Sequence, residues 1–164
     1  MPDPREMSND RRLEDLYNDQ ILKFAGNIGR IGRLETPDAT ATAQSRLCGS
    51  TVTVDISVSG ETVTDFAHEV RACALGQASS SIMAQNIVGS TTEELLALRE
   101  EMLRMLKQDG PPPGGRFSDL AALQPVRDYR ARHASTMLTF DAVAEAIARL
   151  SVADTDQRVS AELV

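Results

Sequence analysis

Two cysteines are the residues of this chain best suited to chemistry. Cys73 lies where a strand-like pattern gives way to an Ala/Ser-rich segment, and Cys48 precedes a glycine in the run Leu47-Cys48-Gly49-Ser50. A cysteine that begins a helix faces the positive end of the helix dipole, and the thiolate is the form that binds soft metals or attacks a sulfur donor. A single cysteine is equally able to serve as a small buried hydrophobic residue. Cys73 can therefore be either a reactive thiol or a packing residue.

The composition limits what the chain can bind. Its 164 residues are 41% hydrophobic with few aromatics, which predicts one domain with a core of aliphatic side chains and alanine. The net charge of -7 argues against a surface for nucleic acid or anionic membrane. We find neither the roughly 20 apolar residues of a membrane span nor an apolar signal-peptide region. Because two cysteines are too few for a disulfide framework, we expect a cytoplasmic protein with reduced thiols.

The first part of the chain predicts a helix and then a loop. After a polar lead-in over residues 1–12, apolar residues at helical spacing from Leu13 to Phe24 predict an amphipathic helix of about four turns that stops at Gly26. The segment Gly26–Gly32 contains three glycines, but it lacks the preceding strand of a phosphate-binding motif. A shaped loop is therefore favoured there over a phosphate site.

A period of two between Ala39 and Val70 predicts strands. From Val52 to Val58, valine and isoleucine alternate with polar residues such as Asp55, and Ser59-Gly60 supplies a tight turn into a second run. A preceding strand is expected to end at Cys48. The prediction is a three-stranded antiparallel meander with both cysteines at strand ends.

The second half of the chain is predicted to be helical. The expected helices are Cys73–Val88, one begun by the capping box Thr91–Glu94, a short one over Ser118–Leu123, and a terminal one from Ser135 or Thr136 to about Leu150. The Pro/Gly-rich segment Asp109–Gly115 is an exposed connector. Residues 13–150 are thus expected to form one α+β domain, a three-stranded antiparallel sheet packed with about five helices, and 151–164 a frayed tail.

Four segments resemble motifs of the iron–sulfur cluster scaffold family of IscU, SufU and the NifU N-terminal domain. They are Tyr17–Gly32, Leu47–Ser50, Ala72–Ser81 and Arg132–Ala142. The third is similar to Gly-Cys-x-x-Ser-x-Ala-Ser-x-Ser, the family's most specific motif. The long Pro/Gly-containing segment before the fourth resembles the SufU branch in particular, and the resemblance extends from about Leu13 to Leu150.

The resemblance implies a site built from three cysteines and an aspartate, which holds zinc or a nascent iron–sulfur cluster. By position this chain retains Cys48 and Cys73, but Ser50 replaces the aspartate and Ser135 replaces the third cysteine. A serine hydroxyl is neutral and hard, so it is a poor ligand for a soft metal. An N-cap of the terminal helix is an equally suitable role for Ser135.

Two histidines are candidates to restore the ligand set. His133 lies two residues before Ser135, and His68 lies five residues before Cys73 on the incoming strand. Imidazole is a common zinc ligand, but a lone histidine is more often an ordinary core or surface residue. Both readings remain open for each histidine.

The resemblance implies an iron–sulfur cluster assembly scaffold or sulfur acceptor, with metal, cluster or persulfide sulfur at Cys48 and Cys73. Its partner would be a SufS-like cysteine desulfurase, and any enzymatic role would be limited to sulfur transfer. The alternative is a metal-free adaptor or regulator that keeps the fold and the desulfurase-docking surface. For a shared site, the two sulfurs must lie side by side. Because Cys48 lies on a turn beside Gly49, we expect it to alkylate faster and to accept the persulfide.

Overall fold

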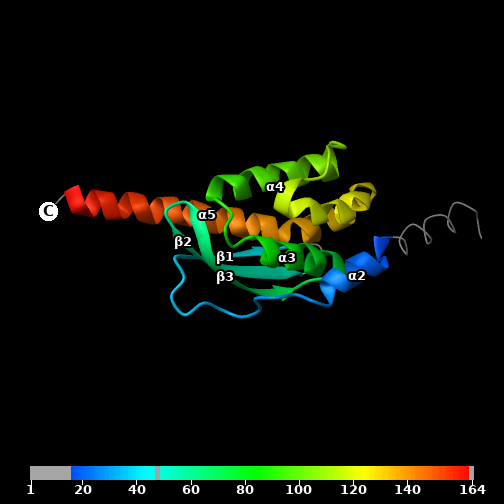
Figure 1. The fold of residues 1–164 in the computed structure, drawn as a ribbon, viewed down its shortest axis with the longest axis horizontal. Helices are drawn as coiled ribbons and strands as arrows, with labels where there is room; N and C mark the ends of the chain where they lie inside the picture. The colour runs from blue at the N-terminus through cyan, green and yellow to red at the C-terminus, as the bar shows by residue number, and fades with distance from the viewer. Residues whose placement is uncertain (1–15, 47–48, 163–164) are drawn as a thin grey trace, which may run out of the picture.

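The computed structural model describes residues 16–46 and 49–162, with side chains described up to residue 150. The elements are α2 (Asp19–Ala25), β1 (Ala39–Gln44), β2 (Thr51–Ser59), β3 (Thr62–Arg71), α3 (Ala74–Asn86), α4 (Thr92–Lys107), the 3-10 segments η1 (Gly115–Asp128) and η2 (Arg130–Arg132), and α5 (His133–Glu162). The α+β class is confirmed (Figure 1). Among the described helices, none is long and apolar enough to cross a membrane.

The sheet is the predicted meander, but β1 ends at Gln44, four residues before the expected end at Cys48. Its three antiparallel strands lie in the order β1-β2-β3, so that Val54 in the central strand pairs with Ala41 on one side and His68 on the other. Val52, Val54 and Ile56 are fully buried on the face toward the helices. The alternation of apolar and polar residues therefore sets the two faces of the sheet, because successive side chains of a strand point to opposite sides.

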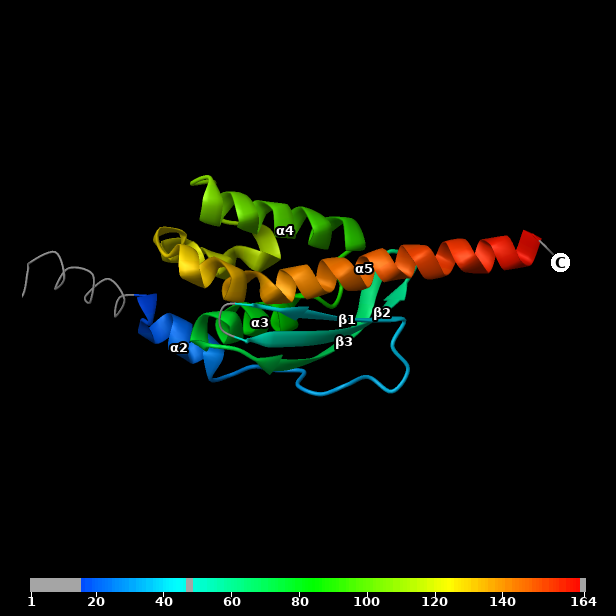
Figure 2. The ribbon, with the colours of Figure 1, turned by 180° about the vertical axis from the view of Figure 1, so that it is seen from behind.

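The helices form two layers over the apolar face of the sheet. α3 and α5 pack directly on the strands, and α4 and η1 lie over them on the side away from the sheet (Figures 1 and 2). Every layer contributes fully buried side chains to one core, including Phe66, Ile82, Met102, Leu120 and Phe140. This stacking brings the start of α5 beside the start of α3, where the candidate site lies.

Capping residues fix where two helices begin. Thr91 Oγ1 accepts a hydrogen bond from Glu94 N at 3.1 Å, which confirms the predicted start of α4. In the first helical region, Asn18 Oδ1 accepts from Ile21 N at 3.0 Å, so α2 begins only at Asp19. The prediction of one continuous helix through Tyr17 and Asn18 is therefore wrong, because the Asn18 side chain caps a new helix start by accepting from one backbone N–H. The predicted stop at Gly26 is confirmed.

The last two helical regions differ from the prediction in their bounds. η1 covers Gly115–Asp128 rather than Ser118–Leu123, and it contains Pro125. α5 begins at His133, before the expected Ser135 or Thr136, and its backbone stays helical to Glu162 instead of ending near Leu150. Fraying of this end in solution stays a prediction.

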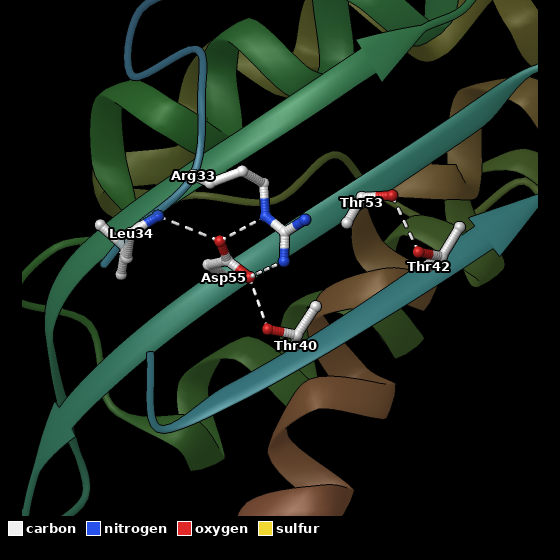
Figure 3. Close-up of polar contacts among 6 residues, drawn as sticks. All are labelled: Arg33, Leu34, Thr40, Thr42, Thr53 and Asp55. Carbon is white, nitrogen blue, oxygen red and sulfur yellow. Dashed lines mark hydrogen bonds and ion pairs between the residues drawn. The ribbon is translucent and has the colours of Figure 1, made fainter. Parts of the chain in front are cut away.

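A buried carboxylate holds the loop after α2 against the polar face of the sheet (Figure 3). Asp55 is 0% exposed and accepts hydrogen bonds from Arg33 Nε at 2.7 Å, Arg33 Nη2 at 3.1 Å, Leu34 N at 3.0 Å and Thr40 Oγ1. Burial alone would raise the pKa of Asp55. The hydrogen bonds and the positive charge of Arg33 outweigh burial and hold this pKa below its ordinary value.

The same loop also pairs with the free edge of β3. Gly32 N donates to the His68 carbonyl at 2.9 Å, and His68 N donates to the Arg30 carbonyl at 3.1 Å. The imidazole of His68 is fully buried, and its Nε2 donates to the Gly29 carbonyl at 2.9 Å. The glycines thus serve to shape a loop that lies against a strand edge, as the shaped-loop interpretation predicts.

Protonation of His68 should destabilise the fold. Burial lowers the pKa of His68, against a smaller opposing effect of the Gly29 carbonyl. The unfolded state therefore binds this proton first, and the stability from the neutral imidazole should be lost as pH falls below about 6.5. We expect urea unfolding to show a smaller loss of stability between about pH 7.5 and about pH 5.5 in His68→Gln than in the parent. Equal losses in both proteins would contradict this.

Candidate functional site

Cys73 lies at the junction of β3 and α3, as the sequence indicates. It is the residue immediately before α3, in an extended conformation, and its side chain is half-buried. Its Sγ lies 3.5 Å from Ser135 Oγ, in the first turn of α5. The fold therefore brings together two positions that are 62 residues apart in the chain and that match two ligand positions of the scaffold family.

Ser135 is not a helix cap. Because α5 begins at His133, Ser135 lies inside the first turn, and its Oγ donates to the Arg132 carbonyl at 3.2 Å. The N-cap reading is therefore wrong. The side chain is buried, and its hydroxyl contacts both the Cys73 sulfur and the Arg132 carbonyl.

Ser50 lies at the same end of the sheet as Cys73. Thr51 pairs with Arg71, which places Ser50, one residue earlier, beside the strand end that leads to Cys73. Ser50 is buried, at 7% exposure. Cys48 lies outside the described residues, so the approach of its sulfur to that of Cys73 stays a prediction.

The Nε2 atoms of both histidines are hydrogen-bonded to backbone carbonyls rather than to residues of this site. His133 is buried, and its Nε2 donates to the carbonyls of Val126 at 3.0 Å and Arg127 at 3.1 Å. Two residues along a helix correspond to a rotation of about 200°, so His133 and Ser135 point to nearly opposite sides of α5. The Nε2 of His68 is already engaged with Gly29. The structure therefore places both imidazoles in structural hydrogen bonds.

The described residues do not fit a four-ligand zinc site. Within residues 16–46 and 49–162, no group of three or more His, Cys, Asp or Glu side chains could hold a metal ion. Cys73 supplies one thiol, and Ser50 and Ser135 supply neutral hydroxyls where zinc sites use thiolate, imidazole or carboxylate. Even with Cys48 added, this set offers two thiols in place of three thiolates and a carboxylate.

The geometry agrees with comparisons to known proteins. A model of the NifU-like N-terminal domain family matches residues 16–136, most of the chain. The chain belongs to this family. Among curated relatives, the iron–sulfur cluster assembly scaffold protein IscU of Thermotoga maritima is 26% identical over 83% of this chain and 95% of the relative. The zinc-dependent sulfurtransferase SufU of Bacillus subtilis is 25% identical over 87% of this chain and 97% of its own.

Solved structures place the NifU-like domain in the same family. A nitrogen-fixing NifU-like protein (N-terminal) from Brucella abortus is 61% identical, with a TM-score of 0.84 over 85% of this chain and 97% of that one. A putative SufU scaffold from Fervidobacterium islandicum shares the fold, with a TM-score of 0.75 at 21% identity. The resemblance to the IscU, SufU and NifU family is thus confirmed.

Gly76 sets how closely Cys73, before α3, approaches Ser135 in α5 of this NifU-like domain. The sequence analysis did not identify this glycine. A Cβ at Gly76 would lie 2.7 Å from Ala72 Cβ and 3.0 Å from the Ser135 carbonyl oxygen. The absent side chain lets the first turn of α3 approach α5 and keeps Cys73 beside Ser135. The family motif has Gly and Ser at positions 72 and 76, where this chain has Ala and Gly. That exchange of side-chain size was the available signal.

Restoring a side chain at Gly76 should loosen the site. We expect Gly76→Ser to lower the free energy of unfolding by about 1 to 3 kcal/mol, because the added atoms overpack the contact with Ala72. Cys73 should then alkylate faster, since α5 must move away from it. Adding Ala72→Gly should recover much of the lost stability and slow the alkylation of Cys73 again. Urea unfolding and mass spectrometry of alkylated peptides measure the two effects, and a double variant no better than Gly76→Ser would contradict the explanation.

Proposed function

We propose that this NifU-like domain acts in iron–sulfur cluster assembly as a sulfur-accepting scaffold. In this role Cys48 and Cys73 hold sulfur or a nascent cluster, without a permanently bound zinc ion. The observation that carries the proposal is the Cys73–Ser135 contact, which keeps one family thiol and replaces another by a hydroxyl. Sulfur transfer needs a thiol, whereas zinc retention needs the full ligand set.

The proposed donor is a SufS-like cysteine desulfurase that carries a persulfide. A thiolate of this chain attacks the terminal sulfur of that persulfide, a new S–S bond forms, and the donor's S–S bond breaks as its cysteine leaves as a thiolate. The transfer involves no net oxidation or reduction. We place the reaction in the cytoplasm, where a reducing environment keeps both thiols available.

We assign the acceptor role to Cys48 rather than Cys73. Gly49, its neighbour, has a positive φ of 71°, which supports a turn at this position. Cys73, in contrast, is half-buried and hydrogen-bonded to Ser135. Reactivity of a thiol requires access as well as nucleophilicity, so Cys48 should react first.

Mass spectrometry after incubation with the cognate desulfurase and cysteine, without oxygen, tests the proposal. We expect one added sulfur on Cys48 in the parent and in Cys73→Ser, and none in Cys48→Ser. Sulfur only on Cys73 would overturn the assignment of the acceptor. Sulfur on neither thiol would overturn the sulfur-accepting function.

The second candidate function is a metal-free adaptor that binds the desulfurase without carrying sulfur. It is favoured by the same hydroxyls at Ser50 and Ser135, which remove two of the family's ligands. Desulfurase binding without sulfur transfer would support it. Elemental analysis of protein purified without oxygen and without a metal-binding tag adds a further check, because a full equivalent of zinc would contradict both candidates.

A further inference from the structure

A cavity of about 700 Å³ lies between the end of α4, the 3-10 segments and the first turns of α5. His133 lines it, so it lies across the first turn of α5 from the side that carries Ser135 and Cys73. The other lining residues are Arg99, Leu103, Leu106, Lys107, Asp109, Arg127, Arg130, Ala134, Met137 and Asp141. The cavity is therefore separate from the candidate sulfur site.

The charge of this cavity opposes that of the whole chain. Four cationic side chains and two carboxylates line it, an excess of two positive charges in a chain of net charge -7. The carboxylates are engaged: Arg99 Nε binds Asp141 at 2.8 Å, and Arg127 Nη1 binds Asp109 at 3.4 Å. The excess charge thus comes from the two remaining cations.

Those two cations are Lys107, at the end of α4, and Arg130, at the start of η2. Within the part of the chain that the structure describes, neither side chain makes a hydrogen bond or an ion pair. Leu103, Leu106 and Met137 add apolar surface to the same cavity. The cavity therefore offers unpaired positive charge beside an apolar wall.

We propose that this cavity binds a small phosphomonoester with an apolar body. A phosphomonoester carries a charge of about -1.5 to -2 at neutral pH, which matches the excess of positive charge. Guanidinium and ammonium groups are the usual protein partners of phosphate, and small-molecule sites commonly enclose roughly 300 to 1,000 Å³. The apolar wall would contact the body of the ligand. This site does not depend on the proposed sulfur chemistry.

Phenyl phosphate is the probe for this proposal, with phenol and inorganic phosphate as its two halves. We expect amide NMR shifts of the full chain to change around Lys107, Arg130 and Met137, and phenyl phosphate to bind at least about tenfold tighter than either half. Added salt should weaken binding, because the cations lie near solvent.

Matched variants locate the site. Lys107→Gln and Arg130→Gln should each weaken phenyl phosphate binding about fivefold to tenfold. Lys23→Gln on α2 and Arg71→Gln on β3 remove the same charge from exposed positions outside the cavity and should bind as the parent does.

Several results would overturn the proposal. Phenol binding as tightly as phenyl phosphate would show that charge does not contribute to binding. Inorganic phosphate binding as tightly as phenyl phosphate would show that the apolar wall does not contribute. Equal weakening by the control variants, or shifts that map elsewhere, would show general attraction to the protein surface. An acidic peptide that binds this cavity more tightly than phenyl phosphate would assign it to a protein partner instead.

Discussion

Zinc affinity is expected to rise by about three orders of magnitude, or on the order of 4 kcal/mol, when Ser135→Cys and Ser50→Asp are combined. Ser135 already lies 3.5 Å from the Cys73 sulfur, so a thiol there enters an existing arrangement. Ser50 lies at the same end of the sheet. With Cys48, the double variant has three thiols and a carboxylate, the ligand types of a closed zinc site.

Competition against a chromophoric chelator measures the affinities. Replacement of zinc by cobalt adds a spectroscopic signature of thiolate ligation. Ser135→Ala with Ser50→Asn is the matched control, because it changes the same positions without adding thiolate or carboxylate. His133→Ala should leave parental zinc binding unchanged, since its Nε2 is bound to backbone carbonyls. A parent that binds zinc as tightly as the double variant would show that another residue completes the site.

Removal of the buried carboxylate at Asp55 should cost about 3 kcal/mol of unfolding free energy. Asp55→Ala leaves the Leu34 amide and the Thr40 hydroxyl without their acceptor and detaches the loop that Arg33 holds. Asp65→Ala is the matched control. Asp65 is on the same sheet and pairs with Arg30 of the same loop at 3.5 Å, but its side chain is 56% exposed, so its loss should cost less than about 1 kcal/mol.

The contribution of Asp55 should also depend on pH. Its pKa in the folded state is held below the unfolded value of about 3.9, so its stabilisation is present above that value and is lost as pH falls through the folded pKa. Chemical unfolding at neutral pH and at about pH 3 should show a smaller acid loss in Asp55→Ala than in the parent. Equal acid losses, or equal costs of the Asp55 and Asp65 changes, would contradict a special role for this carboxylate.

The strands and the start of α4 could be predicted because local chemistry decides them. Alternation around Val54 sets which side chains face the helices, and Thr91 with Glu94 marks a helix start within four residues. These local patterns agree with the tertiary structure, because the same strand faces pack against the helices and the same residue caps α4. The Cys73–Ser135 contact was accessible only through the resemblance to a family, since nothing local joins positions 62 residues apart.

The sequence did not indicate features in which a side chain acts on distant or competing backbone groups. Asp55 has the spacing of a solvent-facing strand residue, yet the loop with Arg33 and Leu34 covers it completely. An aspartate is unfavourable inside a strand, which was the available signal. Asn18 interrupts a spacing that is otherwise helical, and periodicity alone does not register a competing cap. Ser135 lies inside the first turn of α5, which begins at His133, directly after η2.

The order in which the ribosome makes this chain bears on Cys73. The thiol is synthesised well before α5, whose first turn supplies its hydrogen-bond partner 62 residues later. Chains emerge from the N-terminus at about 5 to 20 residues per second, so Cys73 spends several seconds in a nascent chain without Ser135 beside it. During that interval the thiol lacks its hydrogen bond to Ser135. Docking of α5 onto α3 is therefore the step that completes the Cys73–Ser135 contact.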